Sequence, residues 1–383
     1  LVWEYREISR ADIARRTGLS RSTVSTVMSE LLDSGIVEET RQGSSNGGRR
    51  PIMVGFRDNA RTVLGVDVGA SHIDAVLTNL RGEILERGSR VMPTRDAPEA
   101  TLDAITTMAR QLIKASPAPC LGVGVGLPSP VHPSSGRVPR EVLPRWSEVD
   151  VAQALFERID RPVRIDNDAN LGALAELWWG AGRGGDDLVF VKVATGIGAG
   201  LIVNGRIVRG AHGFAGEVGH LSSDPNGPPC ICGVNGCLNV IMGTEALLER
   251  ARLRHPHFPT TTLRADDLTL RDLLTGARSE DPLAREVIQF AGERLGAGLA
   301  NLLNVLDPTV IVLGGDLIEA GPFLLEVVRN TALQRTIVDR SVPERIVVSQ
   351  TDRQGIALGA ATLILREALE TFEIPLDAVQ EAT

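Results

Sequence analysis

A cluster of potential metal ligands constrains the fold of this chain more than any other feature of its sequence. The stretch reads Glu-Val-Gly-His, nine residues, and then Cys-Ile-Cys-Gly-Val-Asn-Gly-Cys, so that His220 precedes Cys230, Cys232 and Cys237. Three thiolates and one imidazole complete the tetrahedral set that zinc prefers, and no position is left for a catalytic water. The alternative, free thiols in a loop, is disfavoured because lone cysteines rarely cluster at ligand spacing beside a histidine. The sequence therefore predicts a structural Zn²⁺ site with these four ligands.

Glu217 lies three residues before His220 and places a carboxylate next to the metal site. A metal-bound imidazole has one ring nitrogen fixed on the ion, which aims the other nitrogen outward. A carboxylate beside a pre-aimed imidazole suits a ligand that carries several hydroxyl groups, such as a sugar. We therefore expect Glu217 and His220 to contact a polyol.

The N-terminal segment has the pattern of a helix-turn-helix. Residues 10–17 predict a short helix that ends at Gly18, and Ser20 is a good N-cap for a second helix. Apolar residues of the second helix recur at three- and four-residue spacing and predict a buried stripe of Val24, Val27, Met28, Leu31 and Leu32. The side chains left on the outer face near its start suit base edges and phosphates: Arg21, Ser22, Thr23, Ser25 and Thr26.

A wing follows this helix pair. Residues 36–41 and 50–56 alternate in polarity and predict two strands around a glycine-rich loop, where Arg49 and Arg50 can reach phosphates or a minor groove. A first helix is expected over residues 1–8. The alternative, a generic two-helix cap with a solvated loop, is disfavoured because the helix spacing, the turn glycine and the basic wing coincide.

Charge separates this segment from the rest of the chain. Residues 1–57 hold nine arginines and seven acidic residues, a net charge of +2, and the remainder carries −10. An acidic body is repelled by DNA, so the N-terminal segment is the expected nucleic-acid surface.

Beyond the wing, a strand pattern occurs twice. Residues 61–67, 73–79 and 83–91 predict three strands joined by a glycine turn and a tight turn, and residues 188–194, 200–203 and 206–209 repeat this order. Helices are expected at 98–115, 169–178, 243–254, 281–306, 323–332 and 354–371. The sequence thus predicts a duplicated α/β domain with a cleft between its halves. Trp178 and Trp179 are expected in the core or at a subunit contact.

Three motifs make the chain resemble the ROK proteins, a family of bacterial sugar kinases and sugar-responsive repressors. They are the Glu-x-Gly-His element at 217–220, the Cys-x-Cys-Gly-x-x-Gly-Cys element at 230–237 and the glycine-rich run at 195–200. The resemblance implies an actin-like, ribonuclease-H-like fold whose two lobes close on a ligand. It divides the chain into a winged helix-turn-helix at 1–57, a small lobe at 58–167 with the C-terminal residues 354–383, and a large lobe at 168–353.

The resemblance also assigns roles in the cleft. Residues 166–170, Asp-Asn-Asp-Ala-Asn, resemble the catalytic segment of the family, in which Asp168 stands at the position of the kinase base and Asn167 at that of a sugar-binding amide. The structural alternative is that both residues only cap a helix. Asn239 stands where the kinases carry a glutamate that contacts the sugar, so sugar recognition is expected to differ here.

The phosphate-binding side departs from the kinase pattern. Family kinases read Asp-x-Gly-Gly-Thr-Lys at the first strand turn, whereas this chain reads Asp67-Val-Gly-Ala-Ser-His72. Ala70 adds a side chain where backbone amides approach phosphate, and His72 replaces the lysine. Ser129 and His132 also differ from the kinase residues of the following loop.

These departures favour a sugar-sensing regulator that represses carbohydrate-metabolism genes, binds operator DNA and needs no catalysis. The competing interpretation is an active ATP-dependent sugar kinase that also binds DNA. A third, a pure protein-interaction scaffold, is disfavoured by the complete set of Asn167, Asp168, Glu217 and His220. Clustered cysteines suit a reducing cytoplasm, and reading a palindrome with one helix-turn-helix per subunit requires a homodimer or homotetramer.

Overall fold

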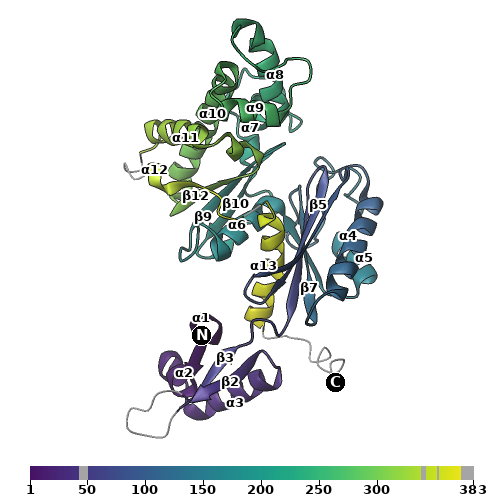
Figure 1. Ribbon diagram of the computed structural model, residues 1–383, viewed down its shortest axis with the longest axis vertical. Helices are drawn as coiled ribbons and strands as arrows, with labels where there is room; N and C mark the ends of the chain where they lie inside the picture. The colour runs from purple at the N-terminus through teal and green to yellow at the C-terminus, as the bar shows by residue number, and fades with distance from the viewer. Residues whose placement is uncertain (43–50, 338–341, 352, 372–383) are drawn as a thin grey trace.

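The computed structural model describes residues 1–42, 51–337, 342–351 and 353–371. Three parts follow one another along the chain: a small N-terminal domain and two larger lobes, each built on its own sheet (Figure 1). The two sheets are separate, and the N-terminal domain lies at one end of the molecule.

The N-terminal domain is a winged helix-turn-helix. Strands β1 (Glu7–Ser9), β3 (Ile52–Phe56) and β2 (Val37–Gln42) form one sheet in that order, and β2 pairs with β3 antiparallel, as expected for a wing. Helices α2 (Arg10–Thr17) and α3 (Arg21–Asp33) share a core with the sheet, made of Ile8, Ile13, Val24, Met28, Val37 and Val54. This small domain therefore has a hydrophobic core of its own.

The ends of the helix pair follow the predicted signals, but the buried stripe is narrower than expected. Gly18 ends α2 with a positive φ of 71°, and the hydroxyl of Ser20 accepts a hydrogen bond from the backbone amide of Thr23 at 3.1 Å. Val24 and Met28 are 2% exposed, whereas Val27 is 39% exposed, so its assignment to the core was wrong. One helical turn brings Val24 and Met28 onto the face that meets the sheet and rotates Val27 away from it.

The expected helix over residues 1–8 is also corrected. Helix α1 spans only Val2–Tyr5, and the chain leaves it at Arg6 with a φ of 60°. Ile8 lies in β1 instead, opposite Val54 of β3, and is buried. Burial of Ile8 against the wing outweighs the local preference for a longer helix. A strand of three residues, such as β1, is too short to produce a recognisable pattern in the sequence.

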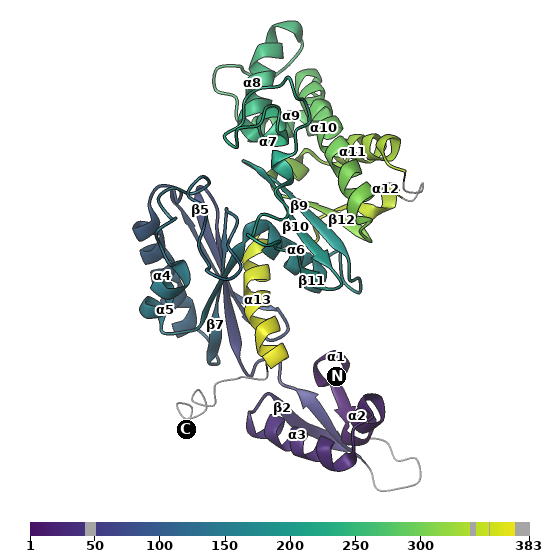
Figure 2. The same ribbon diagram turned by 180° about the vertical axis from the view of Figure 1, so that it is seen from behind.

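The first lobe is built on the sheet β6-β5-β4-β7-β8. Its strands are β4 (Thr62–Val68), β5 (His72–Asn79), β6 (Ile84–Val91), β7 (Cys120–Leu127) and β8 (Val163–Asn167); β4 to β6 are antiparallel, and β7 and β8 join in parallel. Helices α4 (Pro98–Lys114) and α5 (Val151–Ile159) cover one face, where Leu64, Ile73, Leu102 and Leu155 are fully buried. Helix α13 (Gly355–Thr371) covers the other face (Figure 2).

The second lobe repeats this plan on the sheet β11-β10-β9-β12-β13. Its strands are β9 (Leu188–Val193), β10 (Ile197–Val203), β11 (Arg206–Ile207), β12 (Val310–Gly314) and β13 (Ile346–Val348). On one face pack α7 (Leu238–Met242), α8 (Thr244–Arg254), α9 (Leu270–Arg278), α10 (Pro282–Leu306), α11 (Pro322–Arg335) and α12 (Val342–Arg345). Helix α6 (Asp168–Trp179) packs on the other. Three antiparallel strands followed by two parallel ones occur in both lobes, which confirms the predicted duplicated α/β fold; the residue boundaries given above stay a prediction.

Glycines allow α13 to lie directly on the first sheet. A Cβ atom on Gly65 of β4 would stand 1.8 Å from the carbonyl oxygen of Ala357, and one on Gly124 of β7 would stand 1.9 Å from that of Ala360. The helix backbone therefore touches the strand backbone at two points where a side chain has no room. Helix α13 also packs against α6, through Ala360 and Leu363.

The winged domain is joined to the first lobe and to α6 by a set of aromatic contacts. The Trp3 ring lies edge-on to Trp178 and Trp179, with ring centroids 5.7 and 6.3 Å apart, and its indole N–H donates to the carbonyl oxygen of Leu80 at 3.1 Å. The Arg81 guanidinium covers the same ring at 4.7 Å. We call Trp3, Arg81, Trp178 and Trp179 the tryptophan junction. Trp178 and Trp179 thus lie at a contact between domains, which is neither of the two expected locations, the core and a subunit contact.

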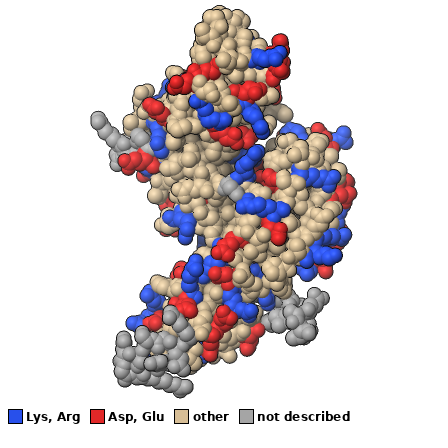
Figure 3. Space-filling view, viewed as in Figure 1, with Lys and Arg blue, Asp and Glu red and all other residues tan. Residues whose placement is uncertain are grey.

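Surface charge is finely mixed. On the face shown in Figure 3, arginine and lysine side chains are interspersed with acidic ones over the winged domain and over both lobes. None of the helices in the described part of the chain combines the length and apolar character needed to cross a bilayer.

Candidate functional site

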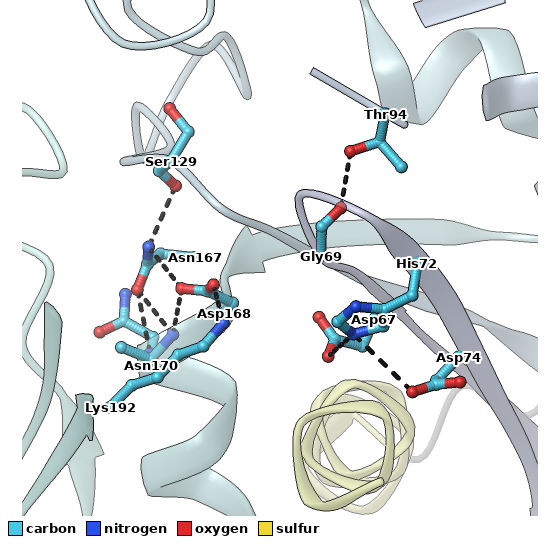
Figure 4. Close-up of polar contacts among 11 residues, drawn as sticks. Asp67, Gly69, His72, Asp74, Thr94, Ser129, Asn167, Asp168, Asn170 and Lys192 are labelled. Carbon is cyan, nitrogen blue, oxygen red and sulfur yellow. Dashed lines mark hydrogen bonds and ion pairs between the residues drawn. The ribbon is translucent and has the colours of Figure 1, made fainter. Parts of the chain in front are cut away.

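The junction of β8 and α6 presents the polar segment 166–170. Asn167 is the N-cap of α6, and its side-chain oxygen accepts from the backbone amides of Ala169 and Asn170 at 2.9 and 3.1 Å. Oδ1 of Asp168 accepts from the amide of Ala169 at 2.7 Å and from Nδ2 of Asn167 at 3.2 Å, and its Oδ2 accepts from the Lys192 ammonium at 2.6 Å (Figure 4). Helix capping thus explains the hydrogen bonds of Asn167 and of one oxygen of Asp168. The ion pair between Asp168 and Lys192 of β9 is not part of a cap.

Asp166, the residue before Asn167, also stabilises this segment through hydrogen bonds. It is 1% exposed, and its Oδ1 accepts from the amide of Asn167 and from Nδ2 of Asn170. Its Oδ2 receives both Nε and Nη2 of Arg209, at 2.9 and 2.5 Å. The buried Asp166 carboxylate, which accepts two hydrogen bonds from Arg209 on one oxygen, therefore fixes the end of β8 where α6 begins.

His72 fills the turn between β4 and β5. An ideal Cβ on Gly69 would stand 2.2 Å from Cε1 of His72, so the imidazole lies directly on the backbone of this turn. Its Nε2 is 3.7 Å from Oδ2 of Asp67 and 3.8 Å from Oδ2 of Asp74 (Figure 4). The neighbouring Asp67 carboxylate raises the pKa of His72 more than burial lowers it. The backbone of this turn is therefore covered by the His72 side chain.

The four predicted metal ligands come together. One ligand atom from each of His220, Cys230, Cys232 and Cys237 lies within 4.8 Å of every other. Sγ of Cys232 is 3.4 Å from Sγ of Cys237, and Sγ of Cys230 is 3.5 Å from Nδ1 of His220. Ligands at about 2.3 Å from a tetrahedral ion stand about 3.8 Å apart, so this set fits a zinc-sized ion with small adjustment. Burial lowers the pKa of His220, which favours the neutral imidazole that a metal binds.

The loop can make this turn because of Gly236. Its φ is 63°, and a Cβ there would stand 1.7 Å from the carbonyl oxygen of Asp224. Glycine alone tolerates both the backbone conformation and the contact. Cys237 is thereby brought back toward the ring of His220.

Glu217 faces the opposite nitrogen of that ring. Oε2 of Glu217 is 3.8 Å from Nε2 of His220, so Nδ1 points to the cysteines and Nε2 points to the carboxylate. Burial raises the pKa of Glu217 to about 7, and the negative charge of Asp168 contributes in the same direction. The carboxylates of Glu217 and Asp168 therefore share one electrostatic environment although they are distant in sequence.

Asn239, the fifth proposed sugar residue, is partly committed to the backbone. Its side-chain oxygen accepts from the amide of Ile197 at 2.7 Å, and a Cβ on Gly219 would stand 2.5 Å from the same oxygen. This hydrogen bond stabilises the start of β10 at Ile197, whereas the sequence predicted that the strand begins at residue 200. Asn239 thus lies between β10 and the 3₁₀ turn Val218–His220.

The proposed DNA-reading side chains lie on the exposed face of α3. The residues Arg21, Ser22, Thr23, Ser25 and Thr26 are all exposed. Hydroxyl groups of Ser22 and Thr23 each lie 2.8 Å from that of Ser20, which orders the start of the helix. Arg49 and Arg50 lie outside the described residues.

Two cations beside this polar segment were not predicted from the sequence. Lys192 and Arg209 pair with the two aspartates that flank Asn167, and neither belongs to a motif. The rarity of lysine was a signal, since Lys114 and Lys192 are the only two in the chain. A lysine inside a strand as apolar as 188–193 needs a buried partner, and that requirement points to a carboxylate.

Comparisons with known proteins agree with this architecture. The ROK family model matches residues 63–367, and a winged helix-turn-helix DNA-binding model matches residues 2–38. The xylose repressor of Bacillus subtilis (strain 168) is 32% identical over 366 residues, covering 95% of this chain and 92% of that protein. The DNA-binding transcriptional dual regulator NagC of Escherichia coli (strain K12) is 30% identical over 382 residues, covering 96% of this chain and 91% of NagC.

Solved structures of both kinds share the fold. A ROK family transcriptional regulator, a homologue of the E. coli MLC protein, superposes with a TM-score of 0.81 at 26% identity, covering 94% of this chain and 92% of that one. A ROK family glucokinase from Streptomyces griseus, solved with glucose and AMPPNP, gives a TM-score of 0.70 at 28% identity, covering 79% of this chain and 98% of the kinase. The regulator match extends over the winged domain, and the kinase match leaves about a fifth of this chain uncovered.

Proposed function

This chain belongs to the ROK family, and we propose that it is a sugar-responsive DNA-binding regulator that represses carbohydrate-metabolism genes. The observation that supports the proposal is the union, in one chain, of a helix-turn-helix whose second helix has an exposed outer face and a cluster of polar side chains where β8 meets α6. Relatives that match over nearly the whole chain are named xylose repressor and N-acetylglucosamine repressor. The effector is accordingly a monosaccharide or a close derivative.

The proposed sugar site consists of Asn167, Asp168, Glu217, His220 and Asn239. Asp168 and Glu217 supply hydroxyl acceptors, and Nε2 of His220 faces the same side as Glu217. A ligand that presents donors and acceptors together suits this mixture of carboxylate, amide and imidazole. In this role Asp168 binds a hydroxyl and transfers nothing.

The metal is proposed to be zinc and structural. Three cysteines and one histidine are the donor set that zinc prefers, and the set leaves no ligand position open. A bound ion would fix the ring of His220 and so orient Nε2 toward the sugar. Zinc thereby joins the stability of the 220–237 loop to effector recognition.

On the DNA side, the proposal uses α3 and a second copy of the chain. Arg21, Ser22, Thr23, Ser25 and Thr26 enter the major groove, and Arg49 and Arg50 of the wing contact the backbone or the minor groove. Two subunits reading half-sites about 34 Å apart require at least a homodimer. A sugar changes operator affinity only through its differential affinity for two arrangements of the lobes, typically worth about 1–3 kcal/mol.

A sugar kinase that also binds DNA is the second candidate, favoured by the likeness to the S. griseus glucokinase. Two observations weigh against it. The imidazole of His72 lies on the turn that would receive phosphate, and the Asp168 carboxylate is engaged by an ammonium. A general base has to be free to take a proton from the hydroxyl it activates.

The deciding experiment measures operator affinity without ATP. A duplex that the protein selects from a random pool is titrated by fluorescence anisotropy, with and without D-xylose, D-glucose and N-acetylglucosamine, and ATP turnover is followed in parallel. We expect one sugar to change the affinity by about 5- to 150-fold while ATP is not consumed. A response that requires ATP, or sugar-dependent ATP consumption, would favour the kinase.

A further inference from the structure

A fully buried carboxylate near the end of α6 accepts hydrogen bonds from a distant part of the chain. Oε1 of Glu176 accepts from the hydroxyl groups of Ser349 and Thr351 at 2.5 and 2.7 Å. The same oxygen accepts from the backbone amides of Thr351 and Gln350 at 3.1 and 3.2 Å. Oε2 accepts from the amide of Ala181 at 2.8 Å. Four of these five bonds therefore connect α6 to residues 349–351.

These three residues lie where the chain passes from one lobe to the other. They follow β13, the last strand of the second sheet, and precede α13, which covers the first sheet. Helix α6 packs between the second sheet and α13, and a Cβ on Gly359 of α13 would stand 1.8 Å from the carbonyl oxygen of Leu171. Glu176 thus joins a helix of the second lobe to the segment that leads back to the first.

The donor set of Glu176 requires a carboxylate. All five partners are N–H or O–H groups, and an ionised carboxylate is a side chain that only accepts. Its burial is costly unless hydrogen bonds replace the lost water, and donors left without an acceptor are costly as well. A relative shift of α6 and 349–351 would break four bonds together, so the contact strongly favours one arrangement of the two.

The helices that meet beside Glu176 are also those that contact the winged domain. Helix α6 begins at Asp168 in the proposed sugar site and ends at Trp179 in the tryptophan junction. The indole N–H of Trp179 donates to the hydroxyl of Thr362 in α13 at 2.7 Å. Helix α13 in turn packs with Ile36 of the winged domain. The position of α13 relative to α6 therefore bears on how the winged domain is held.

We propose that Glu176 is a positioning residue for the sugar response: it holds residues 349–351 on the end of α6, so that α6 and α13 move as one body and carry the winged domain with them. The inference rests on the proposed function for the sugar and the operator. Glu176 itself belongs to neither the proposed sugar site nor the DNA-reading face. Without its hydrogen bonds the sugar still binds, but less of the resulting movement reaches the recognition helices.

The test compares Glu176→Gln with a matched substitution of another buried carboxylate. Asp281 is 5% exposed, and its carboxylate likewise accepts from hydroxyl groups and backbone amides. All its partners lie within the second lobe: Thr261, Thr262, Leu283 and Ala284. Glu176→Gln and Asp281→Asn each place an amino group among donors, so both should lower the melting temperature. Asp281→Asn therefore reports the effect of lost stability alone.

The decisive readout is the change in operator affinity that the sugar causes, with sugar affinity measured by titration calorimetry. We expect both variants to bind the sugar within about threefold of the wild type. In Glu176→Gln the sugar-induced change should shrink at least threefold, whereas Asp281→Asn should respond as the wild type does. A full response in Glu176→Gln, or an equal loss in both variants, would overturn the proposal.

Amide hydrogen exchange tests the same contact without sugar or DNA. Peptides that cover 349–351 and α13 should exchange at least tenfold faster in Glu176→Gln than in the wild type, but not in Asp281→Asn. Equal exchange in all three proteins would overturn the proposal. If Glu176→Gln does not fold, Thr351→Val, which removes one hydroxyl donor at similar size, replaces it in both assays. If no sugar changed the operator affinity of the wild type but exchange rose as expected, the proposed function would fail while the role of Glu176 in joining α6 to α13 would stand.

Discussion

Replacing Trp3 by alanine should weaken the docking of the winged domain on the lobes and its coupling to the sugar site. Trp3 is half-buried, and its ring contacts Trp178, Trp179 and Arg81 and donates one hydrogen bond to the carbonyl of Leu80. The substitution removes every one of these contacts. The winged domain keeps its own core, so we expect it to stay folded after release.

The magnitude follows from the contacts that are lost. An edge-to-face ring pair contributes about 0.5–1.5 kcal/mol, a partly exposed cation–π contact about 0.5–1 kcal/mol, and one hydrogen bond about 0.5–1.5 kcal/mol. Because Trp3 is only half-buried, the low end of each range applies, and two ring pairs, one cation–π contact and one hydrogen bond total about 2 kcal/mol. A loss of about 2 kcal/mol shifts the ratio of docked to released domain about 30-fold.

The effect on sugar response depends on α6. This helix begins at Asp168 in the cleft and ends at Trp179 in the tryptophan junction, so that one rigid element touches both regions. In Trp3→Ala we expect sugar affinity to stay within about twofold of the wild type, because Trp3 lies outside the cleft, while the sugar-induced change in operator affinity shrinks toward one. Operator affinity without sugar should also fall, since the two recognition helices of a dimer no longer have a fixed spacing.

The assay is operator anisotropy with and without the sugar, together with limited proteolysis between the winged domain and the first lobe. Trp3→Phe is the matched control, because it keeps a ring against Trp178 and loses only the hydrogen bond. Intrinsic fluorescence adds a direct readout, since three of the four tryptophans belong to the junction. A Trp3→Ala protein that is cleaved faster but responds to sugar like the wild type would refute coupling through the tryptophan junction.

Three further outcomes are expected. Cys232→Ser should remove the zinc, lower the melting temperature by several degrees and weaken sugar binding at least tenfold through His220. The control Cys120→Ala lies outside the cluster and should keep one zinc per chain by metal analysis. Normal sugar affinity without zinc would contradict the shared role of His220. Arg21→Ala should weaken operator binding, lower the slope of log affinity against log salt by about one and leave sugar affinity unchanged, and the exposed Arg206→Ala serves as the control for charge. The pKa of His72 is raised from its ordinary value of 6.5, so its contribution to stability is complete below pH 6.5 and is lost as the pH rises through the folded-state pKa. His72→Gln should therefore flatten the curve of melting temperature against pH in that window. An unchanged curve would contradict the pairing with Asp67.

Local signals in the sequence were sufficient for much of the fold. Ser20 and Gly18 marked the helix ends of the DNA-binding motif because capping and left-handed backbone are decided within a few residues. The repeated strand order and the ligand spacing of the cysteines are likewise local or periodic. Val27 and Ile8 were misassigned because their burial depends on which neighbour each face meets, which is a tertiary property.

The cleft was predictable only in part for the same reason. Asn167, Asp168 and Glu217 stand in motifs, but the cation that engages Asp168 comes from another element. Lys192 lies on β9 and Asp168 begins α6, and no spacing rule connects the two positions. The tryptophan junction was likewise invisible, since Trp3 and Trp178 are joined only when the winged domain docks.

Helix α13 makes the order of synthesis matter for this protein. The strands of the first lobe leave the ribosome early, yet one face of their sheet is covered by Gly355–Thr371, which is made only after the entire second lobe. Residues Ala361, Ile364 and Leu365 of the same helix also pack with Ile36 of the winged domain. A nascent or prematurely terminated chain therefore carries a folded DNA-reading domain on a lobe with an open apolar face, the kind of surface that chaperones and proteases recognise. Helix α13 thus helps to seat the domain that reads DNA, beside the tryptophan junction, and a chain that lacks this helix exposes the apolar face of the first sheet.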